Sequence, residues 1–393
     1  MRWRRRPDRG GRLPSLGQDY TEAHRRYVER LGKSGELWLR TKPFSVPPTR
    51  ELAECLRVFS HLVTKLALGL RAQVLDVGCG PGWLSEYLAR CGYAVTGVDV
   101  SEDMVEIARE RIASIDGPIG HGVEPLAEFH AVPVLDLPWR KRFDAAILYD
   151  AMHHFHEEVE TLRAIRRALA PGGRIFIHEG VRPAAGSQGE EELVAEMEQY
   201  GTLESPFDSE YLLSVLEQAG FTDVSRYAAV DELLDVSAPE DELRRVQERL
   251  AFPPMNTVIA ANPVPAELQG VDSFAARIEA AGRWQPVDGD HVLAVRVTNA
   301  GRSFWPCSAG EAADCGSVTI GPYVPMDDGR IELPRGRLPR PLSTGECAEV
   351  EIRVPTTGIS EQREVRIDAV REGIAWFEDY GSQPLVVSPP NGF

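Results

Sequence analysis

Long apolar runs are missing from this sequence. No stretch approaches the roughly 20 consecutive apolar residues that a membrane-spanning helix needs. The first twelve residues contain six arginines and no apolar segment of the kind found in a secretory signal. We therefore expect a cytoplasmic protein that does not insert into a membrane.

Positive charge and cysteine are also scarce. The chain has 43 lysines and arginines against 60 aspartates and glutamates, which gives a net charge of −17. Such a field repels phosphate backbones, so no nucleic-acid partner is expected. The six cysteines are dispersed and form no Cys-x-x-Cys pair, which favours a reducing compartment. Cys307 and Cys315 could pair or bind metal, and His153, His154 and His156 could also suggest a metal site. Neither group repeats a metal-ligand spacing, so no bound metal is expected.

What the sequence does contain, in its first two thirds, is an alternation of short apolar strands and helices. This alternation predicts an α/β fold with a doubly wound, mainly parallel sheet. Two later strands, 222–229 and 257–261, would add an antiparallel hairpin at its edge. The predicted strands of the parallel part are 73–77, 94–98, 127–132, 143–148 and 174–178, and the predicted helices are 20–39, 50–68, 83–91, 101–112, 158–169, 209–219 and 239–250.

The pattern changes after Pro263, where long helical periods disappear. Short strands separated by Gly, Pro, Asn and Asp predict an all-β, immunoglobulin-like sandwich. We therefore expect an N-terminal arm and lid helix over 1–45, an α/β domain over 46–263 and a β-sandwich over 264–393. The predicted strands of the sandwich are 292–298, 318–320, 350–354 and 364–369.

A glycine-rich loop, Asp76-Val77-Gly78-Cys79-Gly80-Pro81-Gly82, follows the first strand. Ligands of open α/β sheets bind at this edge, where glycines allow sharp turns and close approach. The dinucleotide fingerprint fails because Trp83 stands where its third glycine belongs. A phosphate-binding loop ending in Gly32-Lys33-Ser34 fails because Tyr27 replaces its first glycine.

The remaining pattern, an acid two residues before Gly-x-Gly-x-Gly, resembles motif I of class I methyltransferases that depend on S-adenosylmethionine (SAM). Asp99 ends the second strand, where a carboxylate can accept hydrogen bonds from ribose hydroxyls. Further similar motifs follow in order: Ser101 to Met104, Val134 to Trp139, Tyr149 to Phe155 and Leu169 to Arg174. The resemblance covers about residues 46–263 and implies a Rossmann-like methyltransferase sheet.

The same resemblance implies a set of SAM-binding residues. Asp76 could instead cap the loop, and Met104 and Trp139 could instead be core residues. In this family an apolar residue packs on adenine and a later acid binds the adenine amino group, which Met104 and Asp136 would do here. The expected cofactor residues are Asp76, Gly78, Cys79, Gly80, Gly82, Asp99, Val100, Met104, Asp136, Leu137 and Tyr149.

Transfer of a methyl group to a hydroxyl usually needs a general base with a pKa near neutrality. His153 and His154 follow the fourth strand, and His178 ends the fifth on the same edge of the sheet. We expect His154, then His153 or His178, to act as the base. These histidines could instead pack or fix loops. A helix near the N-terminus resembles the family's lid, and its aromatic residues Tyr20, Tyr27, Trp38 and Phe44 could line the acceptor site or fill the lid core.

The C-terminal segment resembles β-sandwich modules of bacterial surface-polysaccharide enzymes and exporters, through Val295 to Gly301, Trp305-Pro306 and Val370 to Phe377. This implies a sugar or glycan acceptor. Aromatic faces with polar neighbours suit sugars, although they usually fill a sandwich core. The candidates are Trp305, Tyr323, Trp376, Phe377 and Tyr380, with Arg302 and Asp379.

Three hypotheses follow. The first is O-methylation of a bacterial glycan intermediate, and the second is methylation of a non-sugar small molecule with the sandwich forming a homodimer. The third is a SAM-binding regulator or scaffold without turnover.

Overall fold

The fold is taken from a computed structural model of the 393-residue chain. The residues that this structure describes are 22, 26–44, 50–115, 117, 125–204, 206–229, 244, 255–308, 315–326, 329–355 and 364–388. The first 21 residues of the predicted arm and lid segment and nearly all of the predicted helix 239–250 lie outside the described residues.

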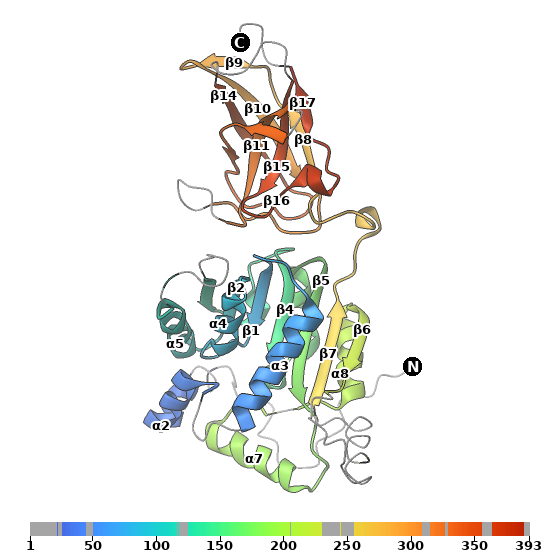
Figure 1. Cartoon of the computed structure of the whole chain (residues 1–393). Coiled ribbons are helices and arrows are strands. Elements are labelled where there is room, and N and C mark those ends of the chain that lie inside the picture. Colours follow the sequence, from blue (N-terminus) through green and yellow to red (C-terminus); the bar gives the residue numbers. More distant parts are fainter. Residues whose placement is uncertain are drawn as a thin grey trace.

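The first part of the described chain, which we call the α/β module (residues 26–261), alternates strands and helices as expected (Figure 1). Its helices are α2 (Tyr27–Thr41), α3 (Arg50–Leu66), α4 (Trp83–Arg90), α5 (Glu102–Ala113), α6 (Glu158–Ala168), α7 (Gln188–Tyr200) and α8 (Ser209–Ala219), with short 3-10 turns η2 (Val134–Asp136) and η3 (Met152–His154). Its strands are β1 (Gln73–Val77), β2 (Ala94–Asp99), β3 (Leu126–Ala131), β4 (Phe143–Tyr149), β5 (Leu169–Gly180), β6 (Thr222–Tyr227) and β7 (Met255–Ala261).

These strands form one seven-stranded sheet in the order β3-β2-β1-β4-β5-β7-β6. The first five pair in parallel, and β7 runs antiparallel between β5 and β6. The order reverses at β1, from which the chain goes first to one side and then, at β4, to the other. The predicted fold class, a doubly wound Rossmann-like sheet with an antiparallel edge, is confirmed.

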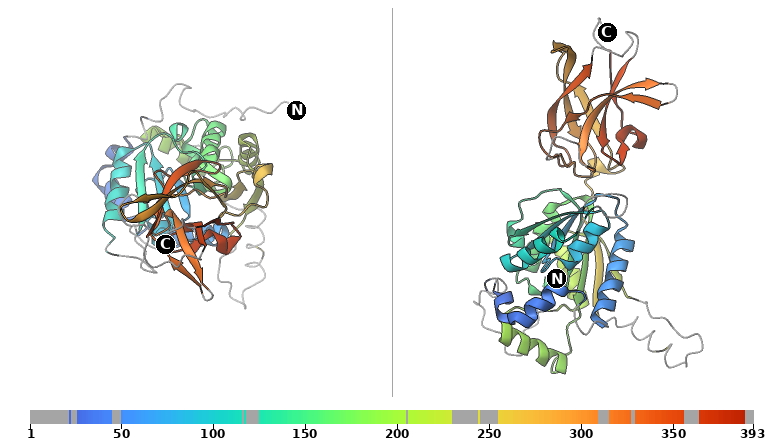
Figure 2. Two further views of the ribbon diagram at one scale, coloured as in Figure 1. Left: turned by 90° about the horizontal axis from the view of Figure 1, so that it is seen from above. Right: turned by 60° about the vertical axis from the view of Figure 1, so that its left-hand side comes forward.

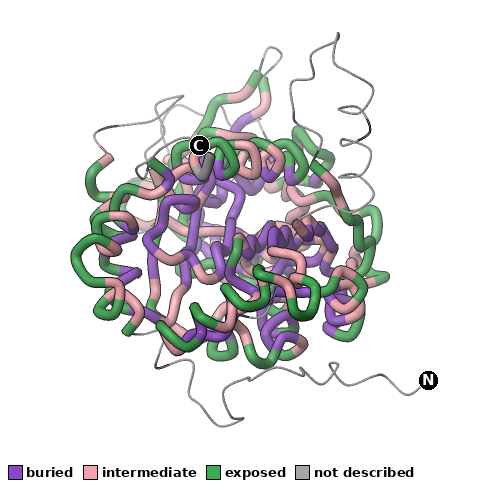
Figure 3. Tube along the Cα trace, turned by 90° about the horizontal axis from the view of Figure 1, so that it is seen from below, coloured by how far each residue is buried: buried purple, intermediate pink, exposed green. Residues whose placement is uncertain are grey.

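Both faces of the sheet are covered because successive side chains of each buried strand point to opposite sides. Val74 and Ile147 pack with α3 and α4, whereas Leu75 and Leu148 pack with α6 and α8. The tube view shows this as buried strands enclosed by helices whose outer surfaces are exposed (Figure 3). Among the described residues, no helix has the length and apolar character needed to cross a bilayer.

The remaining described chain, which we call the β module (residues 264–388), contains two antiparallel sheets. One sheet has the order β14-β10-β8 with β9 on β10, and the other has the order β12-β11-β15-β16 with β13 and β17 attached. Apolar side chains of both sheets share one hydrophobic core around Trp305. The strands are β8 (Ala276–Ala280), β9 (Gln285–Val287), β10 (Asp290–Asn299), β11 (Val318–Met326), β12 (Gly329–Glu332), β13 (Gly336–Arg337), β14 (Cys347–Pro355), β15 (Val365–Arg371), β16 (Ala375–Trp376) and β17 (Leu385–Val387), with 3-10 turns η4 (Ala266–Leu268) and η5 (Phe377–Tyr380).

The β module contacts the amino ends of the parallel strands (Figures 1 and 2). Arg371 donates to the Arg71 carbonyl at 3.1 Å, two residues before β1 begins, and Ser343 donates to the Arg140 carbonyl at 3.1 Å. Arg371, which is itself buried, also attracts the partly buried Asp144 carboxylate near the start of β4. Ligand sites of such sheets lie at the opposite, carboxyl ends, so the β module occupies the edge away from the glycine loop.

Several elements differ from the prediction. The described helix α2 begins at Tyr27 and β5 runs from Leu169 to Gly180, longer at both ends than expected. Helix α7 was not predicted because apolar residues are sparse in its glutamate-rich sequence, and six short strands of the β module, β8, β9, β12, β13, β16 and β17, are too brief to give a periodic signal.

Candidate active site

A cavity of about 840 Å³ opens at the carboxyl edge of the sheet. Its wall includes the glycine loop, the ends of β2, β4 and β5, the turn η3, and helices α2, α5 and α7. No described residue beyond Pro206 lines it, so the β module contributes nothing to this wall. The cavity therefore belongs to the α/β module alone.

The glycine loop forms one side of the cavity. Gly78 and Gly80 line it with φ angles of +69° and +50°, in the left-handed region that glycine adopts without strain. A Cβ atom placed on Gly80 would meet nothing within 4 Å, so this loop leaves open space beside its backbone. Gly82 lies behind the wall, where an added Cβ would stand 2.6 Å from that of Ala108, so its role is close packing of loop and α5.

Asp76 is buried below the loop and does not line the cavity. Its Oδ2 atom accepts a hydrogen bond of 2.6 Å from Ser85 of α4, and burial raises its pKa to about 6. Cys79 lines the wall, and burial together with Asp99 and Asp76 raises the pKa of its thiol well above the usual range. The structure thus places Asp76 where it fixes the loop, and Cys79 as an uncharged wall residue.

Asp99 stands at the tip of β2 and faces the cavity. Its two carboxylate oxygens accept backbone N–H groups from Gly80 at 3.0 Å and from Ser101 at 2.9 Å. Burial raises the pKa of Asp99, while these hydrogen bonds act in the opposite direction. Each oxygen keeps a lone pair that can accept a hydroxyl hydrogen.

The wall next to Asp99 is apolar. Ser101 caps α5 by accepting from the Met104 N–H at 3.4 Å, and Val100 and Met104 line the cavity there. The wall also includes Val132, Pro133, Val134 and Leu135. Asp136 and Leu137 do not line the cavity, and Asp136 is exposed. The loop after β3 thus presents apolar side chains where the prediction had placed an adenine-binding carboxylate.

These features fit SAM. The open space beside Gly80 allows the ligand to approach the backbone closely. Asp99 can accept hydrogen bonds from two ribose hydroxyls, and the apolar wall can contact the flat adenine base. The Tyr149 ring stacks on His178 with centroids 5.4 Å apart. Tyr149 lines the cavity but His178 does not, because its Nδ1 atom is held 2.9 Å from the Thr257 hydroxyl behind that ring.

His153 is clamped between two carboxylates. Its Nδ1 lies 2.7 Å from Glu179 Oε2 and its Nε2 lies 3.2 Å from Glu204 Oε2. Burial disfavours the imidazolium, but the charges and hydrogen bonds of Glu179 and Glu204 prevail and raise the pKa of His153 well above its usual value. Glu179 also accepts the backbone N–H groups of Ala151 and Met152, which fixes the turn η3. His153 is therefore a charged, immobilised group.

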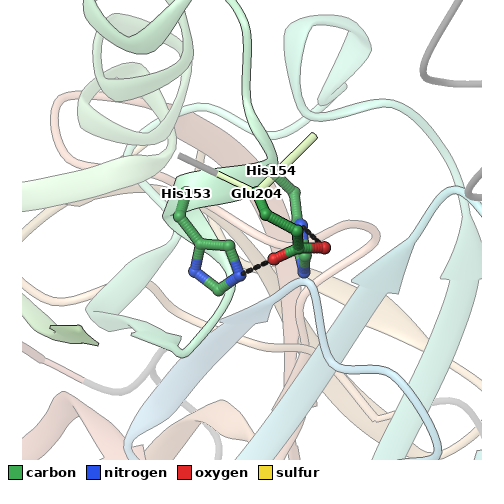
Figure 4. A group of neighbouring side chains, drawn as sticks. All are labelled: His153, His154 and Glu204. Atoms are coloured by element: carbon green, nitrogen blue, oxygen red, sulfur yellow. Dashed lines mark ion pairs between the residues drawn. The ribbon is translucent and has the colours of Figure 1, made fainter. Parts of the chain in front are cut away.

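His154 is in the opposite electrostatic state. Burial and the neighbouring His153 charge lower its pKa, so the ring is neutral near pH 7. Its Nδ1 lies 2.8 Å from the Leu203 carbonyl oxygen, which can only accept a hydrogen bond, so Nδ1 carries the hydrogen. Nε2 is then the basic nitrogen. Figure 4 shows Glu204 between the two histidines.

The same side chains could hold a metal ion. Donor atoms of His153, His154 and Glu204 lie within 4.8 Å of one another, as do those of Asp150, His153 and Glu179. Since Glu179 and Glu204 already hold both nitrogens of His153, a metal would have to displace one of these pairs. The absence of a bound metal stays a prediction.

Several wall residues were not predicted. Glu204 comes from the segment between α7 and α8 and gives no sequence signal, because only the fold brings it to η3. Helix α7 contributes Glu192 and Glu196, and a capping motif was available for it, since Ser187 accepts from the Glu190 N–H. From α2 and its end, Tyr27, Trp38, Leu39 and Lys42 line the cavity, while Phe44 does not; Tyr20 lies outside the described residues.

Comparison with known proteins agrees with this geometry. Residues 74–173 match the sequence profile of a family described as a methyltransferase domain. This part of the chain is thus similar to a methyltransferase domain. The matched span runs from β1 to the glycines of β5 and contains the glycine loop, Asp99, both histidines of η3 and the apolar wall.

Two curated relatives resemble this part of the chain. The methyltransferase GfsG of Streptomyces halstedii is 34% identical over 137 residues, which cover 34% of this chain and 46% of that protein. The ubiquinone biosynthesis O-methyltransferase of Xanthomonas oryzae pv. oryzae is 36% identical over 110 residues, 27% of this chain and 42% of that protein. The chain thus spans less than half the length of these relatives.

Among solved structures, phosphoethanolamine N-methyltransferase 2 of Haemonchus contortus in complex with SAM aligns with a TM-score of 0.45 and 17% identity, covering 61% of this chain and 60% of that one.

Proposed function

We propose that this chain is a SAM-dependent O-methyltransferase that acts on a hydroxyl group of a sugar or another small hydroxylated molecule. The methyltransferase domain and its SAM-compatible cavity support the reaction class. O-methylation is favoured by the histidine pair, because a hydroxyl needs to lose its proton, and it is also the activity in the name of the Xanthomonas relative.

The observation that carries the proposal is the state of His154. It is a neutral imidazole on the cavity wall whose Nδ1–H is committed to the Leu203 carbonyl, which leaves Nε2 as the basic atom. SAM supplies an electrophilic methyl group on a sulfonium. His154 accepts the hydroxyl proton, and His153, held by Glu179 and Glu204, fixes η3 and keeps a positive charge beside it.

The direct test is methyl transfer from labelled SAM to a panel of sugars, glycosides and phenols. We expect transfer to at least one hydroxylated acceptor and a fall in kcat of roughly 100-fold in His154→Ala, since general bases contribute about 10²–10⁴-fold. The SAM affinity should remain unchanged. His178→Ala, which alters a histidine outside the cavity wall, is the matched control and should retain most activity. Equal rates for His154→Ala and the native chain would remove His154 from this role.

A finer form of the proposal is that the acceptor is a glycan intermediate of bacterial surface-polysaccharide synthesis. Its support is the sequence resemblance of the β module. The β module, however, buries Trp305 and Phe377 in its core, and Tyr323 and Trp376 are buried beneath arginines. Only Tyr380 of these aromatic candidates is exposed. A glycan array on the full chain, with Tyr380→Ala as the variant, tests whether this module binds sugar.

The second candidate is a methyltransferase for a non-sugar small molecule, in which the β module has a structural or dimer-forming role. This is favoured by the position of the β module at the strand edge away from the cavity. Sedimentation of the full chain distinguishes a dimer from a monomer. Cytoplasmic location, domain limits at 45 and 263, and the regulator hypothesis stay predictions.

A further inference from the structure

The part of the cavity beyond the cofactor loop is strongly acidic. Apart from Asp99, the described wall contains these five acidic residues: Asp150, Glu157, Glu192, Glu196 and Glu204. Among the described residues of this wall, Lys42 is the one lysine or arginine. The His153 imidazolium is already paired with two carboxylates. A cleft lined by one sign of charge concentrates the field, and the net charge of −17 reinforces it.

Helix stability does not account for the acidic face of α7. Glu192 and Glu196 line the cavity one turn apart, and like charges at this spacing destabilise a helix. The 13-residue helix carries five glutamates and no lysine or arginine. Glu190 and Glu191 suit the positive N-terminal end, whereas Glu196 lies in the second half, where the dipole does not favour an acid.

Glu196 is also repelled by a second acid of the wall. Burial and the Glu204 charge raise the pKa of Glu196. Its ionised carboxylate is therefore less stable in the cavity wall than it would be in water. The Tyr27 hydroxyl beside them has its pKa raised to about 12 by burial and then by Glu196. A positive charge in the cavity would relieve this repulsion.

Aromatic rings complete the same wall. Tyr27 and Trp38 line the cavity, and carboxylates next to aromatic faces are the usual surroundings of a bound ammonium group. The Lys42 ammonium already lies 5.0 Å from the centre of the Trp38 ring, so this wall accommodates such a charge.

We propose that the acceptor carries a protonated amine, which Glu192 and Glu196 bind, while a hydroxyl of the same molecule faces His154. The inference rests on the proposed function. An ammonium has no lone pair to attack a methyl group, so the amine anchors the acceptor and the hydroxyl reacts. Acceptors with carboxylates or phosphates, including nucleotide sugars, would be repelled.

The test compares three sugars of the same ring size that differ in charge: D-glucosamine, N-acetyl-D-glucosamine and D-glucuronic acid. Their binding to the full chain loaded with S-adenosylhomocysteine is measured by saturation-transfer NMR titration. We expect glucosamine to bind at least about fivefold more tightly than its N-acetyl form, and glucuronic acid to bind least.

The variant Glu192→Gln/Glu196→Gln should reduce glucosamine binding to the level of N-acetylglucosamine. The matched control is Glu191→Gln/Glu198→Gln, which removes the same charge from the same helix outside the cavity wall, and it should keep at least half of the preference. Equal or absent binding of glucosamine, or an equal loss in the control, would overturn the proposal. So would N-methylation of an amine acceptor in turnover.

The two proposals fail separately. If the native chain does not bind SAM in calorimetry, the proposed function is wrong, yet the sugar series on the unliganded chain still reports whether the acidic wall selects an amine. If Glu192→Gln/Glu196→Gln weakens the binding of SAM, these residues bind the cofactor and the amine proposal is contradicted.

Discussion

At the scale of single residues, two adjacent histidines are set to opposite charge states by their neighbours. His153 is paired with Glu179 and Glu204, and His154 lies partly buried next to that charge. Pairs of titratable groups whose environments push their pKa values apart are typical of acid–base sites. The sequence identified both histidines, but it could not reveal their states, because Glu204 reaches them only through the fold.

The pH dependence of kcat/KM tests this assignment. Because the pKa of His154 is lowered from 6.5, the neutral base is present at pH 7 and is lost only as the pH falls further. We expect a plateau above neutrality and an acid limb with its midpoint below 6.5, measured under saturating SAM. The limb should disappear from the residual activity of His154→Ala. A midpoint above 6.5 would contradict the assignment.

Asp368 of β15 offers a separate residue-scale prediction. It is fully buried, and desolvation raises its pKa to about 7 in the folded chain, against about 3.9 when unfolded. Between these two pKa values, Asp368 is protonated in the folded chain and ionised in the unfolded chain. The stability that this proton contributes is fully present below about pH 4 and is lost as the pH rises through 7.

Asp368→Asn keeps this position neutral. We expect the variant to gain stability over the native chain at pH 8.5, by up to roughly 4 kcal/mol, and little at pH 4. The exposed Asp288→Asn in the same module is the control for thermal denaturation at both pH values. A gain independent of pH would show that the Asp368 carboxylate is not the titrating group.

At the scale of elements, α2 is fastened to the cofactor loop by one side chain of α5. Arg111 donates to the carbonyls of Lys42 at 2.8 Å and Arg40 at 3.0 Å, which α2 leaves free at its end. It also donates to Pro81 at 3.2 Å and pairs with Glu86 at 2.9 Å. Since Trp38, Leu39 and Lys42 line the cavity, this contact shapes its wall.

Arg111→Ala should therefore cost stability and cofactor affinity together. Loss of one partner of a largely buried pair costs about 3–5 kcal/mol, which we expect in urea unfolding, with SAM bound at least fivefold more weakly in calorimetry. The control Arg109→Ala removes an exposed pair from the same helix and should cost less than about 1 kcal/mol. Similar effects for both variants would mean that α2 does not depend on Arg111.

The strands and the cofactor loop were predictable because their signals are local. The run Gln73–Val77 and the glycines after it reveal a buried strand and a tight turn without any distant contact. Asp136 shows the limit of this reasoning, since motif similarity suggested a carboxylate in the wall and the turn η2 instead presents Val134 and Leu135. Helix α7 was missed because its sequence contains many glutamates and few apolar residues, so it lacks the helical pattern of a packed face. Two of these glutamates, Glu192 and Glu196, line the cavity instead.

At the scale of the whole molecule, the two modules meet at one edge of the sheet and the cavity opens at the other. Strand β1 alone places roughly 20 Å between Arg71 and Gly78, at about 3.3 Å per residue. The geometry therefore does not support the prediction that the β module positions the acceptor in the cavity of its own chain. Glycan capture by the β module would have to act on a long chain or on a neighbouring molecule.

The contact between modules is expected to stabilise the chain without affecting the cavity. Arg371→Ala removes a buried guanidinium that donates to the Arg71 carbonyl and attracts the partly buried Asp144 carboxylate, which should cost about 1–3 kcal/mol in denaturant unfolding. The SAM affinity should change less than twofold. The control is Arg296→Ala, which removes one partner of the exposed Arg296–Glu349 ion pair in the β module. A large loss of SAM affinity would reveal coupling between the two edges.

Binding of SAM in the cavity at the glycine loop, through Asp99, underlies both proposals for this chain. It is tested by calorimetric titration of the native chain and of Asp99→Ala with SAM. We expect a saturable one-site isotherm for the native chain and at least tenfold weaker binding for the variant, with unchanged thermal stability to within a few degrees. Absence of SAM binding to the native chain, or equal affinity in Asp99→Ala, would contradict it.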